Sequence, residues 1–441
     1  MPPVGHQADF EGTIMIERAA ILSTGDEIIT GKVVDTNSNY IADKLIEAGL
    51  DVTSIVTVGD VPERIIWAWE QAMVHADVII STGGIGPTAD DLTTELVAKV
   101  AGVGLTFSEE VAENIRRIFA SLNRTMPENN LKQAQFPEGS TIIPNHLGTA
   151  PGYRLDLDTP HGRRHLVILP GVPREMKPMM QETVLAWIGE TRGGGEVFLT
   201  RTFQTFGISE SGLDELVSGV IAEDEGKLAF RANFPQISMR VTVRGKEGEI
   251  EDRVEMLAQR LREKIGAYVY GEGDVTMEAV VGRLLKEQGK TVGFAEACSG
   301  GLVSHRLTNV PGSSAYFLGT IIAYSDSAKS EILDVSEETL RQHGAVSEET
   351  VKEMADGVRK CLGTEIGVAV TGIAGPDGGT PDKPVGTACL ALSMEGTLVS
   401  RQYKLWGNRE WIKTLLSQLS LDWVRRALLQ IPIAESGFIR R

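Results

Sequence analysis

Three short apolar runs in the first part of the chain each end in a glycine-containing loop. The runs are AAILSTG, ADVIISTGG and RHLVILPG, and helical patterns such as SNYIADKLIEAGL and DLTTELVAKVAG lie between them. Strands that alternate with helices in this way are typical of βαβ units, which build a mostly parallel sheet. We therefore expect an α/β domain over residues 15–185.

The rest of the chain shows two further patterns. Residues 186–272 combine two amphipathic helices with alternating strands such as ISMRVTVRG, and this predicts a small α+β domain. After the glycine-rich break YGEGDVT, strands and helices alternate again, which predicts a second α/β domain over residues 273–441. The first 14 residues have no periodicity, and we expect a disordered extension there.

Composition bounds the class of protein. With 441 residues the chain exceeds the ~250–300 residues that one core can fill, so two or three domains are expected. It has neither a signal peptide nor an apolar run of about 18 residues, which predicts a cytoplasmic protein with no membrane partner. A formal net charge of −17 disfavours broad nucleic-acid binding. The three cysteines form no C-x-x-C pair, and we expect them to be buried and reduced.

Glycines and acidic residues gather at strand ends in the first domain, where open α/β sheets bind ligands. The segments STGDE, STGGIGPTADDLT and LPGVPREM supply Asp26, Glu27, Gly83, Gly84, Gly86, Thr88, Asp90, Asp91 and Gly171. Glycine loops let backbone N–H groups approach a phosphate, but four carboxylates would repel it unless a divalent cation lay between them. The alternative is a helix capped by Thr88 or Asp90, with solvated acids around it.

The motifs STGDEIITGKVVDTNSNYIADKL, STGGIGPTADDLTTE, NHLGTAPGY and LPGVPREM resemble the first domain of the CinA family, competence/damage-inducible protein A. That domain is similar to MoaB/MogA-like molybdopterin-binding proteins. The resemblance implies an ADP-ribose pyrophosphatase that uses Mg, Mn or Co. It implies the metal ligands Asp26, Glu27, Asp90 and Asp91, of which the last two are also catalytic. The substrate-binding residues it implies are Gly25, Asn37, Gly83, Gly84, Gly86, Thr88 and Gly171.

The resemblance continues in order to about residue 435. The family's middle domain is KH-like, but the strongly negative net charge favours a spacer or dimer contact over RNA binding. The last part resembles a nicotinamide-mononucleotide (NMN) deamidase through AEACSGG, AYSDSAK, HGAVS, TGIAGPDGG, KPVGT and WGNR. This implies hydrolysis of a carboxamide without a cofactor, assisted by Tyr324 and Lys329. Taken alone, these two residues would be a core ring and a solvated helix residue.

The family's nucleophilic serine is missing from this chain, because Ala297 stands in its place. Three hypotheses follow. Ser299 could replace it, although two residues displace an oxygen by ~6–7 Å along a strand. Cys298 is a better nucleophile, but strand alternation directs it to the core. The third hypothesis is a pocket that binds a nucleotide with weak or no turnover.

Other residues of this segment predict a mononucleotide site. Gly300 and Gly301 open the helix GLVSHRL, whose N-terminal amides suit a phosphate. Gly372 and Gly375 lie in a second glycine loop, and Arg409 could pair with the same phosphate.

Together these features predict a homodimeric, bifunctional enzyme of pyridine-nucleotide recycling, whose small ligands are ADP-ribose and NMN. The alternative is a regulatory or scaffold protein of competence or the DNA-damage response, which binds nucleotides without catalysis.

Overall fold

The computed structural model describes residues 16–192, 197–222, 224–246 and 248–433, so the extension predicted at residues 1–14 lies outside the described residues. The chain divides into two compact units. One contains residues up to Leu199 together with Thr242–Arg253, and the other contains Thr200–Val241 together with the residues from Val254 onward. The bounds expected for the middle domain, residues 186–272, stay a prediction.

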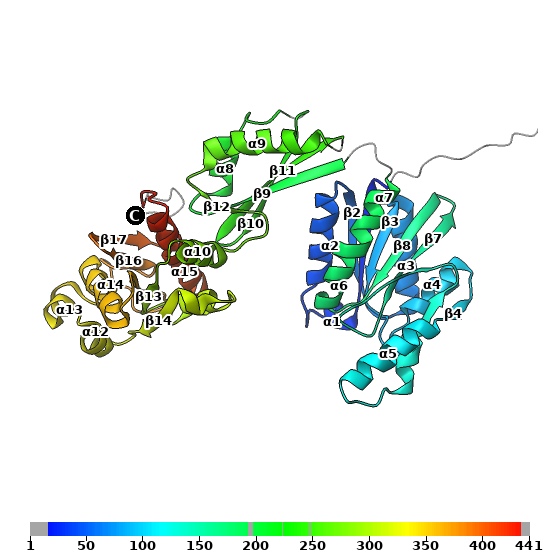
Figure 1. Cartoon of the computed structure of the whole chain (residues 1–441), viewed down its shortest axis with the longest axis horizontal. Coiled ribbons are helices and arrows are strands. Elements are labelled where there is room, and N and C mark those ends of the chain that lie inside the picture. The colour runs from blue at the N-terminus through cyan, green and yellow to red at the C-terminus, as the bar shows by residue number, and fades with distance from the viewer. Residues whose placement is uncertain (1–15, 193–196, 223, 247, 434–441) are drawn as a thin grey trace, which may run out of the picture. The chain divides into compact units, whose positions relative to one another are not determined.

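The first unit is built on a six-stranded sheet with the order β2-β1-β3-β8-β7-β6 (Figure 1). The strands β2, β1, β3 and β8 are parallel, as the βαβ rhythm predicted, and β7 and β6 extend the sheet in antiparallel fashion. The strands of this sheet are β1 (Arg18–Thr24), β2 (Asp51–Val58), β3 (Val78–Thr82), β6 (Thr141–Ile143), β7 (Gly152–Thr159) and β8 (Gly162–Leu169). The strands β4 (Leu105–Phe107) and β5 (Gln135–Pro137) form a separate antiparallel pair. The helical segments are α1 (Asp26–Ile29), α2 (Thr36–Glu47), α3 (Pro62–His75), α4 (Thr93–Ala101), α5 (Glu109–Ser121), η1 (Glu128–Ala134), α6 (Pro173–Met179), η2 (Met180–Val184) and α7 (Leu185–Thr191).

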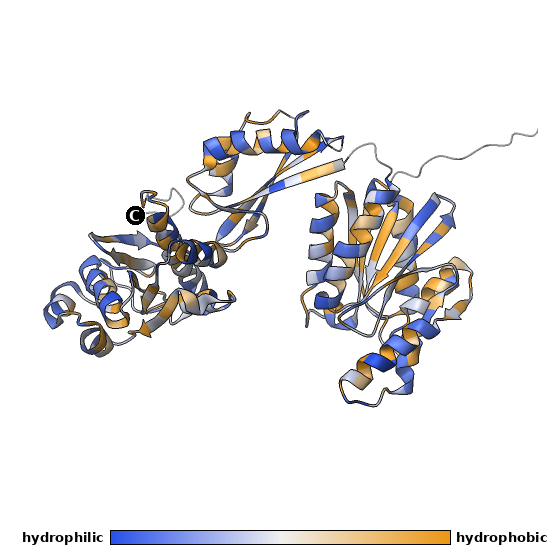
Figure 2. Ribbon diagram, viewed as in Figure 1, coloured by the Kyte–Doolittle hydropathy of each residue, from blue (hydrophilic) through white to orange (hydrophobic). Residues whose placement is uncertain are grey.

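Helices cover both faces of this sheet. Successive residues of a strand point to opposite faces, and in β1 Ala19 and Ile21 pack with residues of α2, α6 and α7, whereas Ala20 and Leu22 pack with residues of α3 and α4. A strand buried on both faces must be apolar throughout, which explains the runs in the sequence and the hydrophobic strands in Figure 2. The carboxyl ends of the parallel strands are left to carry the polar loops.

The middle segment forms a four-stranded sheet with the order β10-β11-β9-β12. Its elements are β9 (Val197–Thr205), α8 (Glu210–Val217), β10 (Lys227–Asn233), β11 (Gln236–Gly245), α9 (Ile250–Ile265) and β12 (Val269–Glu272). The alternating face predicted for ISMRVTVRG is confirmed, because Ile237, Met239, Val241 and Val243 are all buried.

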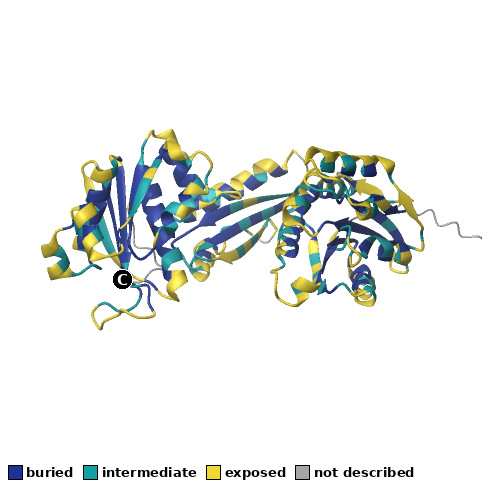
Figure 3. Ribbon diagram, turned by 90° about the horizontal axis from the view of Figure 1, so that it is seen from below, coloured by how far each residue is buried: buried dark blue, intermediate teal, exposed yellow. Residues whose placement is uncertain are grey.

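The C-terminal part contains a five-stranded sheet with the order β14-β13-β15-β16-β17, in which β14, β13 and β15 are parallel. Its strands are β13 (Val292–Glu296), β14 (Phe317–Ile322), β15 (Ile366–Gly372), β16 (Thr387–Met394) and β17 (Thr397–Lys404). Its helical segments are α10 (Met277–Glu287), α11 (Leu302–Thr308), η3 (Ser313–Ala315), α12 (Asp326–Leu333), α13 (Glu337–His343), α14 (Glu348–Leu362) and α15 (Arg409–Leu428). The second α/β fold is therefore confirmed. In Figure 3 the strands are mostly buried, and the helices expose their outer faces.

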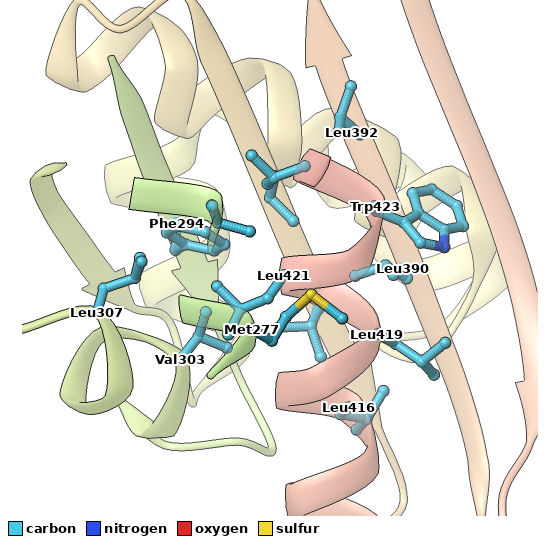
Figure 4. Packing of buried hydrophobic residues seen from close by; sticks show 14 of the residues in the cluster. Met277, Phe294, Val303, Leu307, Leu390, Leu392, Leu416, Leu419, Leu421 and Trp423 are labelled. Carbon is cyan, nitrogen blue, oxygen red and sulfur yellow. The ribbon is translucent and has the colours of Figure 1, made fainter. Parts of the chain in front are cut away.

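Helix α15 lies in the middle of this core. Leu416, Leu419, Leu421 and Trp423 of α15 belong to one buried cluster with Phe294 of β13 and Leu390 of β16. In Figure 4, Leu421 lies toward Phe294, and Leu419 and Trp423 lie on the side of the helix that carries Leu390. The same helix carries a buried ionic cluster, in which the carboxylate of Asp422 accepts hydrogen bonds from Arg425 and Arg426. These two arginines also donate to the carbonyl oxygens of Val269 and Ala267, so the charges are paired and their remaining donors are used. This joins α15 to the segment around β12.

All three cysteines are free. Cys298 and Cys389 are buried as expected, but Cys361 is exposed near the end of α14, so the prediction that all three are buried is wrong. Within the described parts of the chain, no helix combines the length and apolar character needed to cross a bilayer.

Candidate functional site

A cavity of about 590 Å³ opens where β1, β3 and β8 end in the first unit. It is lined by residues of the loops that follow these three strands, together with the start of α2, and this is the edge of the sheet where the sequence placed a ligand. The predicted site residues that line it are Gly25, Glu27, Asn37, Gly83, Gly84, Gly86, Asp90, Asp91 and Gly171. Asp26 and Thr88 are not among the lining residues.

The glycine loop after β3 presents backbone donors to this cavity. Gly83 and Gly84 have φ angles of +102° and +68°, and a Cβ on Gly84 would lie 2.2 Å from Thr93 Oγ1. A side chain is therefore excluded at these positions, and the main chain itself forms the wall. Among the described residues, the amides of Gly84, Ile85 and Gly86 donate to no protein acceptor. Adjacent free N–H groups of this kind form an anion-binding concavity.

Asp26 pairs with Asp60 and does not line the cavity itself. Its Oδ1 accepts a hydrogen bond from the Asp60 amide at 3.2 Å, and the Asp26 amide donates to Asp60 Oδ2 at 3.1 Å. The expectation that Asp26, Asp90 and Asp91 share one cavity is therefore wrong for Asp26. Its role as a metal ligand stays a prediction.

Asp60, which does line the cavity, was missed by the sequence analysis. It follows the end of β2 in the stretch VGD, and this position at a strand end was the available signal. Burial raises the pKa of its carboxyl, the Asp26 amide lowers it, and the charges of Asp26, Glu27 and Asp90 raise it further. The acids at this edge of the sheet thus repel one another.

The segment before α4 is held by Asp91. Its Oδ2 accepts from the Thr88 amide at 2.8 Å and from the Thr88 hydroxyl at 2.5 Å, and Lys132 donates to the Asp91 carbonyl oxygen. The predicted helix cap at Thr88 or Asp90 is wrong, because α4 begins after Leu92 with no side-chain cap. Thr88 instead lines a neighbouring hollow with Lys132. In the described ranges, no three Asp, Glu, His or Cys side chains are arranged to hold a metal ion together.

In the C-terminal part, the stretch AEACSGG is the turn between β13 and α11. Glu296 is fully buried, and its carboxylate accepts from the amides of Gly301, Val303 and Ser304 at 2.9, 3.2 and 3.0 Å and from the Ser304 hydroxyl at 2.7 Å. We predicted that the backbone amides at Gly300 and Gly301 bind a phosphate. The reason given for that prediction is wrong, because the amides at the start of α11 already donate to the carboxylate of Glu296.

The three candidates for the nucleophile position are all buried. Ala297 packs in an apolar cluster with Ala323 and Leu333. Cys298 belongs to the core around α15, as strand alternation predicted, and burial raises the pKa of its thiol to about 12. The Ser299 hydroxyl is fully buried and has no hydrogen-bond partner among the described residues, so no base stands beside it to activate it.

Tyr324 and Lys329 lie in environments opposite to those expected of them in isolation. The Tyr324 side chain is 64% exposed, and its hydroxyl accepts from Arg409 Nη2 at 3.2 Å. Lys329 is 2% exposed, and its Nζ donates to the carbonyl oxygens of Tyr324 and Ser325 and to Asp326 Oδ1. A lysine is buried only where its charge is used or paired, so the prediction of a solvated Lys329 is wrong, as is that of a core ring at Tyr324.

The start of α15 carries two cations beside this segment. Arg409 Nη1 donates to the carbonyl oxygen of Gly375 at 2.8 Å, in the second glycine loop, which begins at Gly372, the last residue of β15. Lys413, one turn later, places its Nζ 3.9 Å from where a Cβ of Gly300 would lie. Within the described ranges, neither cation is paired with a carboxylate. The sequence analysis missed Lys413, although its spacing of four residues from Arg409 puts both on one face of a helix.

Two tryptophans that flank Arg409 in the sequence pack with a phenylalanine. Phe234, in the turn between β10 and β11, stacks on Trp411 with 4.4 Å between ring centroids, and lies 5.8 Å from the ring of Trp406. The two tryptophans are themselves 5.4 Å apart, with edge-to-face geometry. Since Trp406 and Trp411 flank Arg409 in the sequence, the turn before β11 supports the segment that carries this cation.

Comparison with known families divides the chain into three successive matches. Residues 20–189 match the model of a probable molybdopterin binding domain. Residues 200–271 match the damage-inducible protein CinA KH domain, and residues 274–428 match the CinA C-terminal domain. The architecture is thus a molybdopterin-binding-like α/β domain, a KH-like middle domain and a C-terminal α/β domain.

Relatives that cover most of the chain are CinA-like proteins. A CinA-like protein of Geotalea uraniireducens is 42% identical over 421 residues, covering 95% of this chain and 99% of the relative. A CinA-like protein of Dictyoglomus thermophilum is 39% identical over 416 residues, covering 94% and 100%. Among solved structures, the competence/damage inducible protein CihA of Agrobacterium tumefaciens is 33% identical, with a TM-score of 0.34, and covers 35% of this chain and 98% of its own.

Proposed function

The chain belongs to the CinA family, and from this premise we propose that its first domain hydrolyses the pyrophosphate bond of a nucleotide such as ADP-ribose with the help of a divalent cation. The observation that carries the proposal is the pairing of free amides with carboxylates in one cavity. The amides of Gly84, Ile85 and Gly86 can receive phosphate oxygens, and Glu27, Asp60, Asp90 and Asp91 line the same space.

The acidic residues that line the cavity could supply only some of the ligands of a divalent cation. The raised pKa of Asp60, caused by burial and then by the neighbouring acids, indicates negative charge that a cation would relieve. Because no three of these side chains converge among the described residues, the cation would take its remaining ligands from phosphate oxygens and water, as Mg²⁺ commonly does. A cation bound there would neutralise the phosphates and polarise a water molecule. Asp90, exposed at the cavity, and Asp91, which holds the loop, are the residues we assign to it.

The test uses the full chain with ADP-ribose and Mg²⁺, Mn²⁺ or Co²⁺, and resolves the products AMP and ribose 5-phosphate by chromatography. Asp90→Asn keeps the shape of the side chain but removes its charge, and we expect a loss of about tenfold or more in turnover. Asp158→Asn is the matched control, because Asp158 is exposed on β7 and does not line the cavity. No turnover with any of the three metals, or equal turnover in both variants, would refute the proposal.

For the C-terminal domain we propose the binding of NMN, with the phosphate between Arg409 and Lys413. These two cations lack carboxylate partners in the described part of the chain, whereas the start of α11 is already taken by Glu296. Binding of NMN can be compared with that of nicotinamide riboside, which lacks the phosphate. We expect Lys413→Gln to weaken NMN binding about tenfold and leave the riboside unaffected. Lys286→Gln, an exposed lysine of α10, is the control. Equal weakening of both ligands would contradict this assignment.

Deamidation in this domain is the finer proposal, and Ala297 limits it. The Ser299 hydroxyl has no activating partner, so we expect slow or absent ammonia release by the natural chain and a gain with Ala297→Ser. A fast natural enzyme that is unchanged by Ala297→Ser and abolished by Ser299→Ala would show that Ser299 is the nucleophile.

The missing serine also favours a second candidate function, in which the chain binds nucleotides as a regulatory or scaffold protein of competence or the DNA-damage response. Incubation with ADP-ribose and NMN separates the two candidates. Binding of both ligands without cleavage of either supports the scaffold.

A further inference from the structure

The turn between β10 and β11 carries a phenylalanine where turns favour other residues. Because β10 ends at Asn233 and β11 begins at Gln236, Phe234 and Pro235 form the whole turn. Turns favour Gly, Pro, Asn, Asp and Ser for their backbone geometry and local hydrogen bonds, and a phenylalanine contributes neither. The ring of Phe234 is half-buried and packs against the core around α15. It is therefore placed for a contact outside its own sheet.

That contact is with the segment in which Arg409 lies. Phe234 stacks on Trp411, with 26° between the two ring planes. Gly407 has a φ of +101°, and a Cβ on it would lie 2.8 Å from Trp411 Cε3, so the indole ring covers the backbone that leads into α15. The side chain of Asn408 accepts from the Trp411 amide at 2.9 Å. The residues before Arg409 are thus tied to Trp411, and Trp411 is tied to Phe234.

The middle segment also holds α15 at its other end. Arg425 Nη1 donates to the carbonyl oxygen of Val269 at 3.1 Å, near the last turn of this 20-residue helix. The next residue, Tyr270, is buried in the core that α15 shares, and its hydroxyl donates to Gln236 Oε1 at 2.9 Å, directly after the turn. The turn therefore has a fixed position relative to the whole helix.

Arg409 needs such support because its side chain is exposed, and a long exposed side chain samples many rotamers. Its guanidinium donates to the carbonyl oxygen of Gly375 and to the hydroxyl of Tyr324, and both bonds depend on where α15 begins. We propose that Phe234 is a positioning residue, which acts through Trp411 to hold Arg409 where it receives the phosphate of a mononucleotide. The nucleotide site of the C-terminal domain then depends on the domain before it. The inference rests on the proposed binding of NMN and deepens it.

The test measures binding of NMN and of nicotinamide riboside to the full chain by calorimetry. We expect Phe234→Ala to weaken NMN binding about fivefold and to change riboside binding by less than about twofold, because only the phosphate meets Arg409. Phe234→Tyr keeps the ring and should bind both ligands as the natural chain does. Phe234→Leu keeps apolar volume without a ring, and it replaces Phe234→Ala if that variant fails to fold.

A double-mutant cycle separates positioning from general support of the fold. In a chain that carries Arg409→Gln, Phe234→Ala should change NMN binding by less than about twofold, because the group that it positions is gone. In a chain that carries Lys413→Gln, the fivefold loss should persist. Phe317→Ala is the matched control, since Phe317 is half-buried against the same core but begins β14, at the strand end opposite to Tyr324. It should leave NMN binding unchanged.

Three results would overturn the inference. They are equal weakening of both ligands by Phe234→Ala, an unchanged affinity for NMN, and a fivefold loss that persists in the Arg409→Gln chain.

Hydrogen exchange of the unliganded chain gives a readout that needs no ligand. We expect Phe234→Ala to speed the exchange of a peptide from residues 406–413 at least about threefold and to leave residues 417–428 unchanged. A natural chain that binds no NMN would refute the proposed site itself. The exchange result would then decide alone whether Phe234 orders the start of α15, and unchanged exchange at residues 406–413 would show that it does not.

Discussion

Replacing Glu296 with glutamine changes one oxygen to an NH₂ group in the turn between β13 and α11. The hydrogen bonds of Glu296 predict how far this lowers the free energy of unfolding. Each carboxylate oxygen accepts two hydrogen bonds: Oε2 from the amides of Gly301 and Val303, and Oε1 from the amide and hydroxyl of Ser304. A glutamine keeps one oxygen and can turn its NH₂ group toward Ser304, whose hydroxyl rotates to accept from it, but the Ser304 amide then loses its acceptor. Because a bond to a charged acceptor contributes about 1.5–3 kcal/mol, the loss of this one predicts a fall of at least that size in the unfolding free energy.

The measurement is urea unfolding of the full chain, with hydrogen exchange of peptides from residues 297–308 to identify the transition of this domain. Glu365→Gln is the control, since its carboxylate also accepts from an amide and a hydroxyl, both of Thr291, but is exposed. We expect it to cost about 1 kcal/mol. If Glu296→Gln instead left stability unchanged and tightened the binding of inorganic phosphate, the start of α11 would be a phosphate seat and our reasoning about Glu296 would be refuted.

Three further outcomes are expected. Gly83→Ala forces a side chain into a φ of +102° and within 2.6 Å of a strand-end carbonyl oxygen, so it should cost about 1–3 kcal/mol in urea unfolding and weaken ADP-ribose binding. Burial raises the pKa of Asp77, but hydrogen bonds led by that from Arg18 bring it below its ordinary value. Its stabilisation is therefore present above pH ~4 and lost as the pH falls through the folded pKa, so unfolding curves of Asp77→Asn and the natural chain should differ at pH 7 and converge in acid. In the native chain at pH 8, a thiol reagent should label the exposed Cys361 and spare the two buried cysteines, whose thiols have pKa values raised by burial to about 12.

The parts of the fold that follow from local periodicity were predictable. The apolar run AAILSTG became β1 because a strand covered on both faces needs apolar residues at every position, and the alternation that sent Cys298 to the core follows from the same geometry. The position of the glycine loops at the carboxyl ends of strands was predictable too, since it depends on chain order alone.

Side-chain directions in the loops were not predictable, because they depend on partners far along the chain. Asp26 was grouped with Asp90 and Asp91, yet its carboxylate turns to the amide of Asp60, which belongs to the loop after a neighbouring strand. Lys329, taken alone, was predicted to be a solvated helix residue. In the structure its Nζ donates to two backbone carbonyl oxygens just before α12. Neither contact can be predicted from the residue pattern of a single helix or strand.

The sequence by itself determined the order of strands and helices, the loops where a ligand can bind and the absence of a serine at position 297, since each is local to the chain. Tertiary structure alone decided which polar atoms are already satisfied. It gave the amides at the start of α11 to Glu296 and left those of Gly84 to Gly86 without protein partners among the described residues. Hydrogen bonds are made across distance in the chain, and only folding shows which donors and acceptors remain for a ligand.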